Sequence, residues 1–91
     1  MQKDEKLKKK ISKKIGKAIK FYREKLEISQ EQLAYNIGVD RTYISALENG
    51  AKCASVYVLF LLAKELKIKI KDLIDINWNK KGIGEHSKII R

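Results

Sequence analysis

The chain has 91 residues and a mass of 10.5 kDa, which is the size of one small domain. A chain of this length buries only about 60–65% of its unfolded surface, which excludes a two-domain enzyme with a deep cleft. Its 21 Lys and Arg residues against 11 Asp and Glu residues give a net charge of +10. Residues 1–20 hold nine lysines and two acidic residues, whereas residues 21–91 hold twelve basic and nine acidic residues. This distribution indicates a basic arm on a nearly neutral body, and it favours a polyanionic partner such as nucleic acid or acidic lipid.

A single cysteine, Cys53, excludes a disulfide framework and a cysteine-rich zinc site within one chain, and His86 is the only histidine. The sequence has no nucleophile–base set, metal-ligand cluster or phosphate-binding glycine loop, so we expect no enzyme activity, cofactor, metal or small-molecule substrate. The longest apolar run, Val56–Ala63, is too short to cross a membrane, and no apolar segment follows the basic start as in a secretory signal. We therefore expect a cytoplasmic, mostly helical protein.

An amphipathic helix is predicted from about Asp4 to Glu27, because apolar residues recur there at helical spacing. Asp4 is one candidate N-cap, and Ser12 is a second. The segment is therefore either one long helix or a frayed turn ahead of a shorter helix. Gly16 disfavours the long helix by about 1 kcal/mol relative to alanine.

Capping residues and a glycine divide the following segment into shorter helices. Ser29 and Gln32 have the spacing of a capping box, and Asp40 and Ser55 are the predicted N-caps of the next two helices. Gly38 is predicted to end the first of these helices in the left-handed conformation. The predicted helices are Gln30 to about Asn36, Arg41 to about Glu48, Val56–Leu66 and about Ile70 to Ile76.

The expected organisation is an all-α, five-helix domain over residues 13–76. A basic extension at 1–12 precedes this domain and is able to continue its first helix. Residues 77–91 contain glycines and asparagines without a clear period, so we expect a loosely held C-terminal tail.

The two short helices around Gly38 have the spacing of a helix-turn-helix. With Gln30 as the first position, Ala34 is the fifth, where a small side chain lets two helices cross closely. Gly38 is the ninth, where the backbone must turn with a positive φ. The inward positions of the unit are all apolar, namely Leu33, Ile37, Val39, Ile44 and Leu47.

In these residues the chain resembles the Cro/repressor-like, or XRE-type, helix-turn-helix family, over about Ile15 to Ile74. The stretch Asp40–Ser45 is similar to the recognition helix of restriction–modification controller proteins. Ala54 departs from the family pattern, which often has proline at that position. The resemblance implies a transcriptional regulator that binds double-stranded DNA as a homodimer on a palindromic operator.

The resemblance also implies roles for individual residues. It places the helix from Arg41 to Glu48 in the major groove, with its N-terminal residues at the base edges. Arg41 is suited to a bidentate contact with guanine. Arg23 and Glu48 stand where the family has a partly buried ion pair that orients the recognition helix. The implied base contacts are Arg41, Thr42, Ser45 and Ala46, and the implied backbone contacts are Gln30, Tyr43, Asn49 and Lys52.

Two features leave alternatives open. The lysines of residues 1–20 are either a solvated helix face or direct contacts to DNA phosphates. The helix Val56–Leu66 carries surplus apolar residues outside its inward stripe of Val56, Leu59, Leu62, Ala63 and Leu66. Either a second subunit, the extension or the tail with Trp78 covers them, or they form an exposed patch. We favour a homodimer. The expected partner surface is Tyr57, Phe60, Leu61, Ile70, Leu73 and Ile74. The alternative function is a protein-interaction module on the same fold, such as an antitoxin or a coactivator-like bridging factor.

Overall fold

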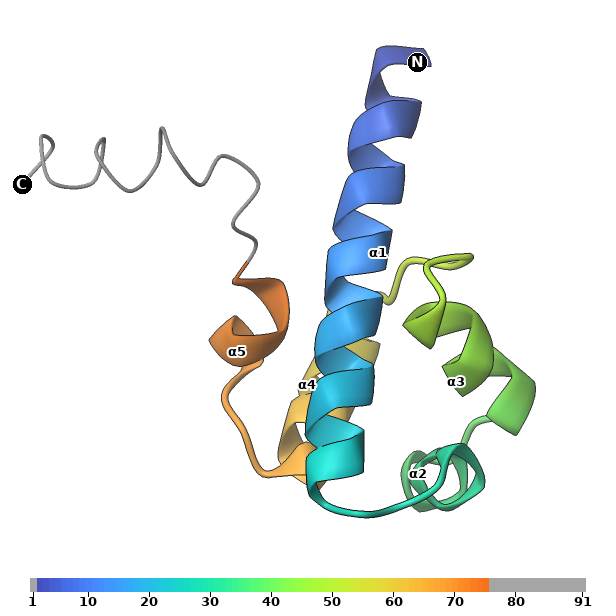
Figure 1. The fold of residues 1–91 in the computed structure, drawn as a ribbon, viewed down its shortest axis with the longest axis vertical. Helices are drawn as coiled ribbons and strands as arrows, with labels where there is room; N and C mark the ends of the chain where they lie inside the picture. The colour runs from blue at the N-terminus through green and yellow to red at the C-terminus, as the bar shows by residue number, and fades with distance from the viewer. Residues whose placement is uncertain (1, 76–91) are drawn as a thin grey trace, which may run out of the picture.

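A computed structural model describes residues 2–75, which form five helices and no strand (Figure 1). The helices are α1 (Gln2–Lys25), α2 (Gln30–Ile37), α3 (Arg41–Glu48), α4 (Val56–Leu66) and α5 (Ile70–Ile74). The expected all-α, five-helix class is confirmed. Within residues 2–75, no helix combines the length and apolar character needed to cross a membrane. The predictions for Ile76, Trp78, His86 and the tail at 77–91 lie outside the described residues.

Helix α1 is one unbroken helix, and its N-terminal turns extend beyond the other four helices (Figure 1). Asp4 lies inside its first turn, and Ser12 is buried in its middle, so both predictions of an N-cap are wrong. Gly16 does not interrupt the helix, because α1 crosses the C-terminal end of α3 at this residue. A Cβ atom on Gly16 would collide with the carbonyl oxygen of Leu47 and would lie 2.7 Å from the carbonyl oxygen of Glu48.

The N-caps of α2 and α4 form as predicted. The Ser29 hydroxyl accepts a hydrogen bond from the backbone N–H of Gln32 at 3.0 Å, and the Ser55 hydroxyl accepts one from Val58 at 3.2 Å. The capping box is only half formed, because the Gln32 side chain donates to Asn36 instead of returning to the helix start. Asp40 occupies the N-cap position of α3 but makes no side-chain capping bond, which corrects its predicted role.

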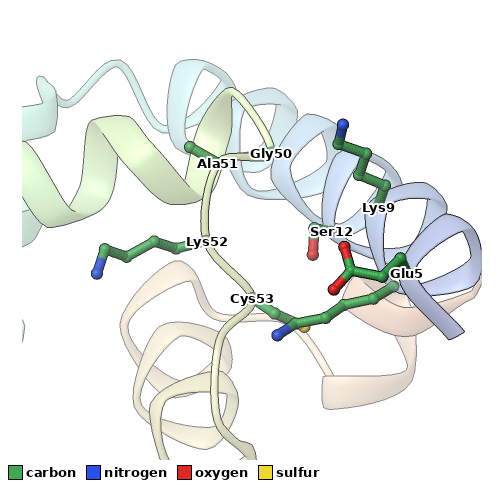
Figure 2. A pocket seen from close by; sticks show the side chains of 8 residues that line it. Glu5, Lys9, Ser12, Gly50, Ala51, Lys52 and Cys53 are labelled. Carbon is green, nitrogen blue, oxygen red and sulfur yellow. The ribbon is translucent and has the colours of Figure 1, made fainter. Parts of the chain in front are cut away.

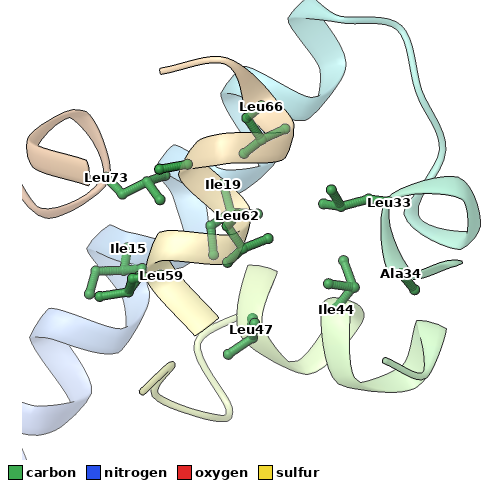
Figure 3. Close-up of a cluster of buried hydrophobic side chains, with 11 residues drawn as sticks. Ile15, Ile19, Leu33, Ala34, Ile44, Leu47, Leu59, Leu62, Leu66 and Leu73 are labelled. Atoms are coloured by element: carbon green, nitrogen blue, oxygen red, sulfur yellow. The ribbon is translucent and has the colours of Figure 1, made fainter. Parts of the chain in front are cut away.

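The core lies where α1 meets the other helices: α1 packs against α3, α4 and α5, and α2 packs against α3 and α4. Leu33, Ile44 and Leu62 are fully buried at its centre (Figure 3). Val56 was predicted to face inward, but it is 66% exposed, because the first turn of α4 lies outside the core and the helix is buried only from Leu59 onward. The buried apolar residues are Ile15, Ile19, Leu33, Ala34, Ile44, Leu47, Leu59, Leu62, Ala63, Leu66 and Leu73.

Candidate nucleic-acid interface

The turn between α2 and α3 sets the position of the predicted recognition helix. Gly38 adopts the left-handed conformation with φ +79°, as the ninth position of the unit requires. The backbone N–H of Val39 then returns to the carbonyl oxygen of Ala34 at 2.9 Å and closes the turn. Ala34 is buried, so its small side chain allows α2 and α3 to lie in close contact. The turn therefore holds α3 at a fixed angle to α2.

Helix α3 is divided into an inner and an outer face. Ile44 and Leu47 are buried in the core at 0% and 1% exposure, so rotation of the helix about its axis would expose apolar surface. The predicted base-contact residues lie elsewhere on the helix: Arg41 and Thr42 are exposed, and Ser45 and Ala46 are half-buried. These four side chains are therefore less buried than Ile44 and Leu47 on the inner face of α3.

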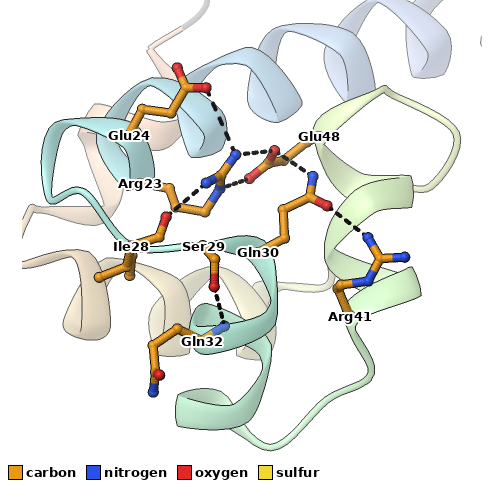
Figure 4. A network of polar contacts seen from close by, with 8 residues as sticks. All are labelled: Arg23, Glu24, Ile28, Ser29, Gln30, Gln32, Arg41 and Glu48. Atoms are coloured by element: carbon orange, nitrogen blue, oxygen red, sulfur yellow. Dashed lines mark hydrogen bonds and ion pairs between the residues drawn. The ribbon is translucent and has the colours of Figure 1, made fainter.

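A chain of hydrogen bonds runs from α1 to the first residue of α3 (Figure 4). Arg23 of α1 binds Glu48 through two contacts, Nε to Oε2 at 2.6 Å and Nη2 to Oε1 at 3.0 Å. Gln30 Nε2 donates to the same Glu48 Oε1 at 2.9 Å. Arg41 Nη1 donates to Gln30 Oε1 at 3.2 Å. The two ends of α3 are thus joined to each other through the N-terminal residue of α2.

The pair of Arg23 and Glu48, implied by the family resemblance, is present and buried. The side chains are 10% and 4% exposed. The hydrogen bond that Arg23 donates to Glu48 is the main cause that raises the pKa of Arg23, which remains charged throughout the usual pH range. Arg23 Nη1 also donates to the carbonyl oxygen of Ile28 at 2.8 Å, so the guanidinium ties α1 to the loop before α2. A bidentate geometry of this kind restricts orientation as well as distance.

The four predicted backbone contacts differ in how free their side chains are. Lys52 is exposed in the loop after α3, and Tyr43 is half-buried against the core. Gln30 already bridges Glu48 and Arg41. Asn49 uses its side-chain oxygen to accept from the backbone N–H of Ala51 at 3.0 Å, which leaves only its amide group for a phosphate.

Sequence reasoning missed the bridging role of Gln30. Its partners lie 18 and 11 residues away, and no local period relates these positions. It also missed a polar link between α2 and α4, in which Asn36 Nδ2 donates to Glu65 Oε2 at 2.7 Å.

Tyr35 is 81% exposed on α2, although aromatic residues are usually at least partly covered.

The expected partner surface on α4 and α5 is largely open. Tyr57, Phe60 and Ile74 are 72%, 57% and 44% exposed, and Leu61 and Ile70 are half-buried. Leu73 is only 1% exposed, so its inclusion in this surface is wrong. Leu73 lies on the side of α5 that packs against α1 and α4, so it belongs to the core and not to the open surface.

No group of three or more His, Cys, Asp or Glu side chains among the described residues is arranged to hold a metal ion. The one described cysteine, Cys53, is exposed in the loop between α3 and α4.

The helix-turn-helix formed by α2 and α3, with the outer face of α3 exposed, is typical of DNA-binding regulators. Residues 19–73, more than half of the chain, match the helix-turn-helix family. The chain belongs to this family, and specifically to its XRE-type branch of DNA-binding transcription regulators, which are not enzymes.

Curated relatives and solved structures agree with this assignment. Control protein C.MunI from a Mycoplasma species is 39% identical over 58 residues, which are 64% of this chain and 78% of the relative. An HTH-type transcriptional regulator from Methanocaldococcus jannaschii is 38% identical over 55 residues, which are 60% of this chain and 83% of the relative. The crystal structure of the restriction-modification controller protein C.AhdI from Aeromonas hydrophila superposes with a TM-score of 0.66 at 32% identity, covering 68% of this chain and 90% of that one.

Proposed function

We propose that the chain is a sequence-specific regulator that binds double-stranded DNA as a homodimer and inserts α3 into the major groove. The exposed N-terminal residues of α3 carry this proposal, since Arg41 and Thr42 are open while Ile44 anchors the same helix. In this geometry Arg41, Thr42, Ser45 and Ala46 meet base edges, and Gln30, Tyr43, Asn49 and Lys52 meet the phosphates. The similarity to control protein C.MunI and to the restriction-modification controller protein C.AhdI supports a regulator of the controller type.

The experiment that tests the proposal is selection of bound duplexes from a random pool with the full chain. A palindromic consensus with half-sites about one DNA turn apart is expected, because a two-fold dimer presents two copies of α3 at that spacing. Recovery of unrelated sequences would overturn sequence-specific recognition, and recovery of single unpaired half-sites would overturn the dimeric geometry.

The substitution Arg41→Ala tests direct base recognition. Removal of a bidentate guanine contact is expected to cost about 1–3 kcal/mol, so affinity for the selected duplex should fall about 5- to 150-fold. Affinity for random duplex should fall much less, because only one charge is removed. Fluorescence anisotropy with both duplexes measures the two effects.

The matched control is Arg41→Lys, which keeps the charge but removes the planar fork of donors. It is expected to behave like the alanine variant on the selected duplex and like the unsubstituted protein on random duplex. Near-normal binding of the selected duplex by the lysine variant would show that Arg41 acts only as a charge.

The substitution Phe60→Glu tests the proposed dimer surface. A charge in the centre of an apolar contact is expected to yield a monomer in light scattering and to weaken binding of a palindromic duplex. Phe21→Glu is the control, since Phe21 on α1 has the same 57% exposure but lies outside the proposed surface. A Phe60→Glu protein that remains dimeric would contradict the proposed interface, and an unsubstituted monomer would favour the protein-interaction module instead.

A further inference from the structure

The excess positive charge of this protein is concentrated in residues 1–20. Residues 21–75 contain eight basic and eight acidic residues, whereas residues 1–20 have an excess of seven positive charges. On α3 itself Arg41 is the only basic residue. Sequence-independent affinity for DNA depends on cations that displace counterions from phosphates. Residues 21–75, which include the whole helix-turn-helix unit, therefore contribute no net positive charge.

Three lysines of α1, Lys8, Lys9 and Lys13, are next to the loop that follows α3. A Cβ atom on Gly50 would lie 2.7 Å from Lys13 Cγ and 3.2 Å from Lys13 Cα, so this loop touches the helix directly. Lys9 is four residues before Lys13 and therefore lies on the same side of α1.

A hollow of about 440 Å³ separates the N-terminal turns of α1 from the same loop (Figure 2). Lys8, Lys9 and Lys52 line it together with one acidic residue, Glu5, and the long side chains of Lys9 and Lys52 extend outward from its rim (Figure 2). All four of these side chains are exposed, and Ser12 is the only buried polar residue among the lining. Such an open, exposed site suits an extended polyanion better than a small enclosed anion.

We propose that Lys8, Lys9, Lys13 and Lys52 form a lysine ridge, a second surface that binds the phosphate backbone of duplex DNA beside the segment read by α3. The ridge begins at the loop directly after the proposed recognition helix. The phosphate backbone of one DNA strand can therefore run from Asn49 and Lys52 along the lysines of the ridge on α1. This proposal rests on the proposed function, because it assumes that α3 lies in a duplex. It assigns specificity to α3 and most of the sequence-independent affinity to α1.

The test is a double substitution on the ridge, Lys9→Gln with Lys13→Gln, and random-sequence duplex is the probe. The slope of log K against log salt is expected to become shallower by about 0.9 for each lysine–phosphate pair that is removed, so by about two for the double variant. Affinities for the selected and the random duplex should fall by the same factor, which leaves their ratio unchanged. Circular dichroism checks that the variant folds, as is expected for two exposed helical positions.

The matched control is Lys25→Gln with Lys64→Gln, which removes the same charge elsewhere on the protein. Lys25 lies over the ring of Phe21 at 5.5 Å in the last turn of α1, Lys64 lies in the last turn of α4, and neither residue lines the hollow. The control should leave the salt slope nearly unchanged.

The outcomes separate the ridge from the proposed function. If the ridge and control variants had the same slope of log K against log salt, the ridge would be overturned. Duplex binding by the unsubstituted protein would still support the proposed function. A fall in the ratio of selected to random affinity would also overturn it, because the ridge lysines would then read sequence. Failure of the unsubstituted protein to bind any duplex would overturn the proposed function and the ridge with it.

Discussion

Replacing Glu48 with alanine is expected to lower the free energy of unfolding by about 3–5 kcal/mol, the range for breaking a buried ion pair by removing one partner. The substitution leaves the buried Arg23 guanidinium without its two carboxylate contacts, and it removes the acceptor of Gln30. The charge of Arg23 persists, because its pKa lies far above neutrality. Urea denaturation followed by circular dichroism measures the decrease in stability.

The double variant Arg23→Met with Glu48→Leu separates stability from orientation. Apolar replacement of both partners of a buried pair is often nearly neutral, so much of the stability should return. DNA binding should stay weak, because Gln30 no longer has Glu48 as a partner and Arg41 no longer has a fixed position. Full recovery of duplex affinity in the double variant would show that the pair stabilises the fold without orienting Arg41.

Replacing Gly16 with alanine is expected to lower the free energy of unfolding by about 3 kcal/mol, as in a strongly overpacked core. The added Cβ atom would meet the carbonyl oxygens of Leu47 and Glu48, which are backbone atoms and are unable to rotate away. Helix propensity alone predicts the opposite sign, a gain of about 1 kcal/mol for alanine in the middle of a helix. Thermal unfolding therefore decides between the two effects.

The control for this substitution is Lys17→Ala at the next position of α1, which is exposed. It should change stability by about 0.5 kcal/mol or less. If Gly16→Ala were as stable as this control or more so, α1 and α3 would be further apart than the structure shows. Weaker DNA binding is also expected for Gly16→Ala, because the clash displaces the end of α3 that carries Glu48.

Local signals explain why the limits of α2, α3 and α4 were predictable. Ser29 and Ser55 form hydrogen bonds within three residues of themselves, and Gly38 adopts its positive φ because the turn requires it. The same reasoning failed at Asp40, whose position is that of an N-cap although its side chain is not used. A position in sequence limits which hydrogen bonds are available, and the surroundings determine which of them form.

Burial was predicted less well than helix limits. The period of α4 placed Val56 on the inner stripe, and the period of α5 did not reveal that Leu73 faces the core. A hydrophobic period identifies the apolar side of a helix but not the neighbour that covers it. That neighbour is determined by how α1 crosses the other helices.

The sequence by itself determined the all-α class, the twenty-residue unit from Gln30 to Asn49 and the concentration of charge in residues 1–20. Each of these depends on composition or on contacts between residues a few positions apart. Only the tertiary structure decided that Gly16 is needed for the crossing of α1 and α3, and that Gln30 connects Glu48 to Arg41. These contacts join residues 11 to 32 positions apart, and such distances are set by how whole helices pack.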